Sequence, residues 1–371
     1  MSLSPENPPV AIDAADCRTG LGDAAATWRG LLADRCALTL LPVLGPDGGD
    51  AVPLALLAGR TMAETAPPNW LAHLDSLAAA IPSEPWGMPG FPVYVTSSNF
   101  GVGSLYAFHR SQDVSHLPHA TPAAAVEVLR RRFGWGENVT IFSHACVSAH
   151  LGLIAAARAL AHGTAERALV FSFDFISPFV AGGFHALKIL NGGMPAPYAD
   201  RPVGSIGLGD GAAFAVLRRG RGEFGLAAHS LHNEMQHFTA NDPAGAGFAA
   251  CLTPVLAAAA GRRVWIKGHG TGTLDSGRLE AEAFGRLQPK SPLVSWKGSL
   301  GHTLGSCGLV ELAITLEAVR GGQTPGTTGS SGPCFGATVA IPAFANGAYD
   351  GVVLASNAFG GAHAACLLTH D

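Results

Sequence analysis

One cysteine and two histidines in this chain stand in sequence settings that suit covalent chemistry. Cys146 follows the apolar, strand-like stretch 139–142 and precedes an Ala-rich, helix-compatible stretch over 147–162. A thiol at the start of a helix meets unpaired backbone N–H groups and the positive end of the helix dipole, which favour the thiolate. His269 and His302 each lie in a Gly-rich segment far along the chain. A cysteine with two histidines is suited to covalent acyl transfer, although most single cysteines are structural.

The setting of His269 indicates a ligand-binding turn. This residue opens the run His-Gly-Thr-Gly-Thr, directly after the strand-like segment 264–266. Ligand and catalytic groups gather at the carboxyl ends of strands in α/β sheets. The glycines allow a substrate to approach the backbone, and Thr271 and Thr273 offer hydroxyl groups. The alternative is a Gly-rich turn with a histidine that faces solvent.

His302 is accompanied by a lysine and a glutamate. Lys297 lies between the apolar segment 293–295 and a small-residue helix expected over 305–320. A lysine in such a buried setting needs a partner, and Glu311 on that helix is the obvious candidate. The alternative is an exposed turn lysine. Near the end of the chain, the run Phe359-Gly360-Gly361 is either a simple turn or a flexible gate with one aromatic side chain.

Composition limits the kinds of protein that this chain can be. Of its 371 residues, 48% are apolar and only 13% are charged. No apolar run reaches the length of a membrane span, so we expect a large subunit interface to cover the apolar excess. A net charge of −4 gives no general case for nucleic-acid binding. Basic clusters at 130–132, 218–221 and 262–263 are either solvated helix ends or a docking patch for an acidic protein.

Cysteine usage points to a reducing compartment. The seven cysteines are widely spaced, with no C-x-x-C pair and no zinc-ligand spacing. An odd number fits a cytoplasmic location, and the Pro-rich, polar residues 1–11 do not resemble a signal peptide. We therefore expect a cytoplasmic protein without a metal site.

The order of expected elements suggests two related halves. The segment 139–173 has the pattern strand, small-residue turn, Ala-rich helix, glycine, strand, and the segment 293–355 repeats it with an insertion. Two copies of one unit predict layers of helices and sheets, with helices buried between two sheets. We expect a loose tail over 1–9, an N-terminal half over 10–215 with the nucleophile, and a C-terminal half over 216–371 with both histidines. The expected helices cover residues 24–32, 121–133, 147–162 and 305–320.

Together these motifs resemble the β-ketoacyl-ACP synthases of the elongating Cys-His-His type, which belong to the thiolase-like superfamily. The resemblance covers nearly the whole chain and is strongest from about residue 139 onward. Four ordered motifs carry it: Ala145-Cys146, Gly207-Leu208-Gly209-Asp210-Gly211-Ala212-Ala213, the His-Gly-Thr-Gly-Thr run, and Lys297 followed by Gly301-His302 and Glu311.

The resemblance implies an α/β fold of α-β-α-β-α layers and a role for each residue of the core site. Cys146 would accept the acyl chain. His269 and His302 would bind the malonyl thioester carbonyl and stabilise the enolate formed on decarboxylation, and His302 would also hydrogen-bond the cysteine. Lys297 and Glu311 would hold the histidines in place.

The resemblance also implies how substrates are bound and delivered. The backbone N–H groups of Cys146 and Phe359 would form an oxyanion hole, with Phe359 as the gate. Thr271, Thr273 and Gly360 would bind the substrate, the two threonines through its phosphopantetheine arm. That arm would arrive on an acyl carrier protein, so no bound cofactor is expected. The chain would form a homodimer, or a heterodimer with a second ketosynthase-like chain.

Departures from the family pattern suggest a specialised pathway. His144 stands where threonine is usual, Gly277 where aspartate is usual, and His363 where asparagine is usual. The run Asn357-Ala358 replaces the common Phe-Gly at the gate. The product would be a fatty acid, polyketide or polyene. Two other functions remain open at this point: a non-catalytic subunit like a chain-length factor, and a cysteine hydrolase.

Overall fold

The structure is a computed structural model that describes residues 9–44, 50–62, 67–191, 193–235, 237, 240–336 and 338–370. The tail expected over residues 1–9 therefore lies outside the described residues, except for Pro9.

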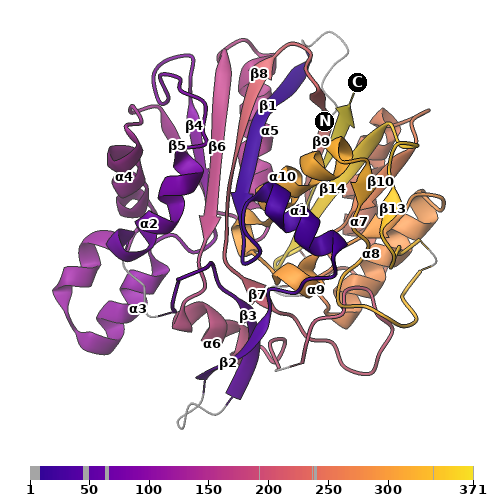
Figure 1. The fold of residues 1–371 in the computed structure, drawn as a ribbon, viewed down its shortest axis with the longest axis horizontal. Helices are drawn as coiled ribbons and strands as arrows, with labels where there is room; N and C mark the ends of the chain where they lie inside the picture. The colour runs from indigo at the N-terminus through magenta and orange to yellow at the C-terminus, as the bar shows by residue number, and fades with distance from the viewer. Residues whose placement is uncertain are drawn as a thin grey trace.

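The described chain is a mixed α/β protein (Figure 1). Its strands are β1 (Val10–Arg18), β2 (Thr39–Leu44), β3 (Asp50–Ala55), β4 (Val93–Thr96), β5 (Val139–Phe142), β6 (Arg167–Asp174), β7 (Leu208–Gly209), β8 (Gly211–Arg219), β9 (Phe224–Asn233), β10 (Val264–Lys267), β11 (Leu293–Val294), β12 (Gln323–Thr324), β13 (Phe344–Ala345), β14 (Gly351–Ala358) and β15 (Ala362–His370). Its helices are α1 (Ala24–Leu32), α2 (Pro67–Ala78), α3 (Val102–Ser111), α4 (Pro122–Phe133), α5 (Ser148–Ala161), α6 (Pro178–Ala186), α7 (Ala246–Ala258), α8 (Leu274–Leu287), α9 (Lys297–Leu300) and α10 (Cys307–Arg320), with 3₁₀ segments η1 (Val114–His119) and η2 (Leu304–Ser306).

A ten-stranded sheet in the order β11-β10-β14-β15-β9-β1-β8-β6-β4-β5 contains two equivalent halves. In the N-terminal half, β1, β8 and β6 are antiparallel neighbours, and β6, β4 and β5 are parallel neighbours. In the C-terminal half, β9, β15 and β14 repeat the antiparallel part, and β14, β10 and β11 repeat the parallel part. The expectation of two related halves is confirmed by this matching order and direction of strands.

The helices form the layers that the sequence predicted. Helices α5 and α10 contact strands of both sheet halves and lie between them, whereas α2 and α4 cover the outer face of one half and α7 and α8 that of the other (Figure 1). Side chains that alternate along each strand serve the two layers: Val93 and Phe171 pack outward, while Tyr94 and Val170 pack toward α5. The result is an α-β-α-β-α fold.

Small residues allow the central helices to lie close to the sheets. A Cβ at Gly152 of α5 would come within 2.7 Å of both Thr96 and Val170 side-chain atoms. Residues Cys307 to Leu316 of α10 are all buried, as expected for a helix enclosed by other layers. Among the described residues, no helix has both the length and the hydropathy of a membrane span.

The expected boundary between residues 215 and 216 falls inside a strand. Strand β8 continues to Arg219, because Arg218 and Arg219 still pair with β1 at Ala11 and Val10. The change from one repeat to the other therefore occurs in the turn between β8 and β9, a few residues later than the sequence indicated.

Candidate active site

Cys146 stands at a tight turn between β5 and α5. The preceding Ala145 has a φ of 45°, a left-handed conformation that costs a non-glycine residue roughly 1 kcal/mol. Ser148 holds this turn: its Oγ accepts from the His144 N–H at 2.8 Å and donates to the Ala145 carbonyl at 2.7 Å. The turn places the cysteine just before the first turn of α5, close to the helix start that the sequence predicted.

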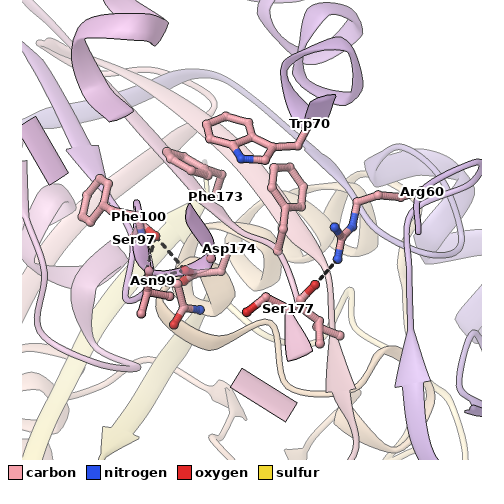
Figure 2. Close-up of a pocket in the computed structure, with 12 residues that line it drawn as sticks. Arg60, Trp70, Ser97, Asn99, Phe100, Phe173, Asp174 and Ser177 are labelled. Carbon is pink, nitrogen blue, oxygen red and sulfur yellow. Dashed lines mark hydrogen bonds between the residues drawn. The ribbon is translucent and has the colours of Figure 1, made fainter. Parts of the chain in front are cut away.

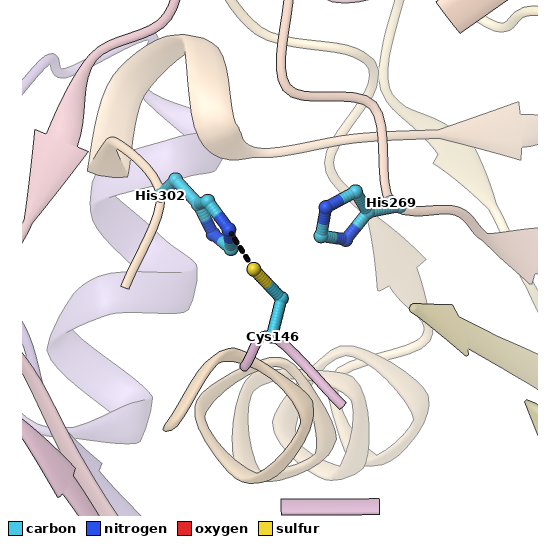
Figure 3. A group of neighbouring side chains, drawn as sticks. All are labelled: Cys146, His269 and His302. Atoms are coloured by element: carbon cyan, nitrogen blue, oxygen red, sulfur yellow. Dashed lines mark hydrogen bonds between the residues drawn. The ribbon is translucent and has the colours of Figure 1, made fainter. Parts of the chain in front are cut away.

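Three segments that are far apart in the sequence bring Cys146, His269 and His302 together (Figure 3). His302 Nε2 lies 2.9 Å from the Cys146 sulfur. The rings of His269 and His302 meet edge to face, with their centroids 5.0 Å apart. One atom from each of the three side chains lies within 4.8 Å of the others, a spacing that would also suit a thiophilic metal ion. All three residues can therefore contact a single thioester.

Burial controls the protonation of this group. It raises the pKa of the Cys146 thiol well above its usual value, while Lys297 acts in the opposite direction. The sequence-based expectation that the helix start would favour a thiolate is therefore wrong for the resting site, because desolvation has the larger effect. Burial, followed by the charge of Lys297, also holds the pKa values of His269 and His302 well below the usual range. The two imidazoles are neutral at neutral pH, and His302 is available to accept the thiol proton.

A buried cluster of charges lies next to the two histidines. Lys297 Nζ is 2.5 Å from Glu311 Oε1, as the sequence predicted. Lys267, at the end of β10, contacts the same oxygen at 2.8 Å and donates to the Gly268 carbonyl. The sequence did not single out Lys267, which stands at the end of an apolar strand. One carboxylate thus serves two ammonium groups, and both contribute to the low pKa values of the histidines.

Glu280 of α8 holds the backbone that carries His269. Its carboxylate accepts from the N–H groups of His269 at 2.6 Å and Gly270 at 2.9 Å, and from the Tyr198 hydroxyl at 3.0 Å. Burial raises the pKa of Glu280, and these hydrogen bonds oppose the shift. Sequence reasoning missed this residue because nothing in its local pattern distinguishes it from other carboxylates on an amphipathic helix.

Asp174, at the end of β6, holds the segment after β4 and lies beside Gly305 of the His302 loop. Its carboxylate accepts from the Ser97 hydroxyl at 2.6 Å and from the backbone N–H groups of Ser98 and Asn99 (Figure 2). Burial raises the pKa of Asp174 to about 6. A Cβ at Gly305 would come within 2.8 Å of this carboxylate and within 3.1 Å of the Ala145 carbonyl. The glycine is therefore needed for the close approach of the two loops.

A second carboxylate supports the site from further away. Asp210, in the Gly-rich motif before β8, forms a buried ion pair with Arg60 at 2.5 Å. It also accepts from the N–H groups of Leu57 and Ile176. In the same motif, Gly209 donates to the His302 carbonyl at 3.0 Å. This motif therefore acts as a structural support for the second histidine.

Two adjoining cavities lead to the cysteine. The inner one, of about 60 Å³, is lined by Cys146, His269, His302 and Thr271, among others. The outer one, of about 650 Å³, shares Thr273 and Phe359 with it. The Thr271 and Thr273 hydroxyls lie 3.2 Å apart. A long, narrow group could therefore reach the sulfur from the surface past both threonines.

Phe359 stands where the two cavities meet. Its side chain is 41% exposed, and its ring centroid lies 6.0 Å from that of Phe184 of α6. Gly360 and Gly361 have φ values of 86° and 74°, which favour glycine and allow a tight turn between β14 and β15. Gly360 is exposed and lines neither cavity, so its predicted contact with the substrate finds no support in this geometry.

The layered α/β fold, with a Cys-His-His group between its two related halves, is the thiolase-like fold. Residues 225–331 match the family model of the β-ketoacyl synthase C-terminal domain. The chain is 32% identical over 219 residues to 3-oxoacyl-[acyl-carrier-protein] synthase 2 of Coxiella burnetii, an alignment that covers 53% of each protein. Over these segments the chain is similar to the β-ketoacyl synthases.

Solved structures share this fold over nearly the whole chain. The AntDE:AntF complex of a type II polyketide synthase acyl-carrier protein with its ketosynthase has a TM-score of 0.85 at 14% identity and covers 99% of this chain and 100% of its own. The ketosynthase ApeO in complex with its chain length factor ApeC, from Xenorhabdus doucetiae, has a TM-score of 0.79 at 19% identity, with 98% of each chain covered. In sequence, however, the chain spans about half the length of the curated relatives it matches.

Proposed function

We propose that this protein is a β-ketoacyl-ACP synthase that joins an acyl chain on Cys146 to a malonyl unit with loss of CO2. The observation that carries the proposal is the contact of 2.9 Å between the Cys146 sulfur and His302 Nε2, with the His269 ring beside it. A nucleophile in reach of a neutral base, next to a second imidazole, is suited to acyl transfer followed by enolate chemistry.

The first half-reaction loads the cysteine. The sulfur attacks the acyl thioester, a new carbon–sulfur bond forms, and the bond to the sulfur of the carrier arm breaks. The thiol proton passes to His302 Nε2 and then to the departing thiolate of the carrier arm, which leaves as a free thiol. Because burial raises the pKa of Cys146, this transfer is needed to generate the nucleophile. Backbone N–H groups of Cys146 and Phe359 would hold the developing oxyanion.

The second half-reaction uses both histidines. The bond between the malonyl carboxylate and its methylene carbon breaks, CO2 leaves, and the electron pair forms an enolate. For this step His302 takes the tautomer that carries its proton on Nε2, so that N–H groups of His269 and His302 would stabilise the enolate oxygen. The methylene carbon then attacks the acyl carbon on Cys146, the sulfur leaves as a thiolate and takes up one proton, and β-ketoacyl-carrier is released. The ion pair of Lys297 and Glu311 would hold the two histidines in place.

The shape of the two cavities supports delivery by an acyl carrier protein. A phosphopantetheine arm in the outer cavity could pass Thr273 and Thr271 and place its thioester near the sulfur. We propose a homodimer, or a heterodimer with a second ketosynthase-like chain, that acts in the cytoplasm without a resident cofactor or metal.

Mass spectrometry of the intact protein after incubation with octanoyl-carrier protein tests this function. We expect an acyl adduct that is absent from Cys146→Ala. The Cys36→Ala variant is a matched control, since Cys36 is exposed and lines neither cavity, and its adduct should remain. Carrier binding without any adduct would contradict the proposal and favour a non-catalytic subunit like a chain-length factor. Release of free octanoate without condensation would favour a hydrolase.

A further inference from the structure

Three buried polar side chains form a hydrogen-bonded series next to the turn between β14 and β15, here called the gate turn (Phe359–Gly361). Asn357, at the end of β14, accepts through Oδ1 a hydrogen bond from His363 Nδ1 of β15 at 2.9 Å. His363 Nε2 lies 3.1 Å from Glu234 Oε1, just after β9. Glu234 in turn donates its backbone N–H to the Gly361 carbonyl of the gate turn at 3.0 Å. Three neighbouring strands therefore end in one connected polar chain.

Glycines leave space for the side chains of this polar series. A Cβ at Gly247 of α7 would come within 2.4 Å of Glu234 Oε2 and 2.6 Å of His363 Nε2. A Cβ at Gly361 would come within 2.4 Å of Glu234 Cγ. Phe248 packs on the His363 ring, with centroids 4.5 Å apart. The imidazole and carboxylate are therefore enclosed on several sides and have little freedom to turn.

The Asn357 amide turns its oxygen toward the imidazole. Since Oδ1 accepts from His363 Nδ1, that nitrogen carries a hydrogen, and Nε2 of the same ring faces Glu234 Oε1. The amide nitrogen Nδ2 of Asn357 is buried and finds no hydrogen-bond partner among the described residues. A buried amide donor without an acceptor is costly, so a partner supplied by a ligand would be favourable.

The open amide belongs to a residue that lines the catalytic cavity. Asn357 lines the inner cavity together with Cys146, His269 and His302. That cavity measures only about 60 Å³, so the part of a substrate inside it is the thioester and its first carbons. A hydrocarbon chain in this cavity would leave the amide donor without a hydrogen-bond partner. An oxygen on a carbon near the thioester would replace it.

We propose that Asn357 is a specificity-determining residue that favours acyl thioesters with an oxygen substituent near the thioester, and that His363 and Glu234 are its positioning residues. The inference rests on the proposed function, because it assigns a role in acyl loading on Cys146.

The test compares two pantetheine thioesters of equal length, 3-oxooctanoyl and octanoyl. The rate constants for acylation of Cys146 are measured for each by mass spectrometry, and their ratio is the readout. We expect the ratio for the wild type to exceed that for Asn357→Leu by about 10- to 100-fold, the effect of an unpaired buried donor. The ratio in Asn357→Leu corrects for the different intrinsic reactivity of the two thioesters. An exposed amide, replaced in Asn138→Leu, is the matched control and should keep the wild-type ratio.

The positioning residues have a separate test. Glu234→Gln and His363→Leu keep the Asn357 amide but remove what orients it, so both should lower the ratio toward that of Asn357→Leu. These variants also keep the inference testable if Asn357→Leu does not fold. Equal ratios in the wild type and all variants would overturn the inference. It would also be overturned if the variants lost only malonyl decarboxylation, because the Asn357 amide would then bind the malonyl carboxylate. If neither thioester acylates the wild type, the proposed function itself fails.

Discussion

Glu311 lies between two buried lysines, and this arrangement predicts unequal effects when its parts are removed. The exposed fractions of the Lys267, Lys297 and Glu311 side chains are 0%, 2% and 7%, and both ammonium groups contact the same carboxylate oxygen. Glu311→Gln leaves two buried cations without a counter-charge. Removing one partner of a buried ion pair costs about 3–5 kcal/mol.

The stability lost in Glu311→Gln is limited because Lys267 can release its proton and become neutral. Burial lowers this pKa to about 8, and loss of Glu311 would lower it further. Deprotonation of Lys267 at pH 7 therefore costs at most about 1.4 kcal/mol, the value of one pKa unit. We expect Glu311→Gln to lower the free energy of unfolding by about 3 kcal/mol, at the lower end of the range.

Removal of Lys267 is expected to change the stability much less than removal of Glu311. Lys267→Met leaves one lysine paired with one carboxylate and relieves the burial of a second cation, so we expect a change of less than about 1.5 kcal/mol. The double variant Lys267→Met/Glu311→Gln should be more stable than Glu311→Gln alone, because only one unpaired cation remains.

Urea denaturation at pH 7 measures these differences from the transition midpoints at constant m value. The exposed Lys290 provides a control, since Lys290→Met removes a lysine that has no such partner and should leave the midpoint unchanged. Equal losses for Glu311→Gln and Lys267→Met would refute the reasoning. So would a double variant that is less stable than Glu311→Gln.

Two further predictions concern acid stability and loop packing. Burial lowers the pKa of His150 to about 4, so the unfolded chain binds more protons between about pH 6.5 and 4 and stability falls as the pH drops, by about 3 kcal/mol for this group. Urea midpoints at pH 7 and 4.5 should therefore show a smaller acid loss in His150→Leu; equal losses would contradict this. A Cβ at Gly209 would lie 2.1 Å from the Leu300 carbonyl. Gly209→Ala should displace the His302 loop and slow CO2 release from malonyl-carrier protein about 100-fold, whereas Gly285→Ala, which meets open space, should not.

Local signals in the sequence predicted several elements well. The helix expected over 24–32 is α1, and the side chain of the preceding Asp23 accepts from the Ala26 N–H at its start. Thr121 caps α4 in the same way, through the Ala124 N–H. A cap depends only on residues three positions apart, so short-range chemistry is sufficient to place it. The internal repeat also predicted the layered architecture, because two copies of one α/β unit must bury their helices between their sheets.

The supports of the site could not be found in this way. Lys267, Glu280 and Asp174 act on backbone or charges far away in the sequence, and each looks locally like an ordinary strand or helix residue. Motif spacing identified Cys146, His269 and His302, which meet at the inner cavity, because chemistry of this kind needs particular residue types. The pKa of Cys146 was misjudged for a related reason: the helix start is visible in the sequence, but the degree of burial is not.

The most direct test of the account is CO2 release from malonyl-carrier protein by variants of the three central residues. In the proposed mechanism, His269 and His302 carry out decarboxylation and Cys146 carries out acyl transfer. We therefore expect Cys146→Ala to lose condensation but still release CO2, and His269→Ala and His302→Ala to lose both. Loss of CO2 release in Cys146→Ala, or its retention in both histidine variants, would contradict the assignment of these roles.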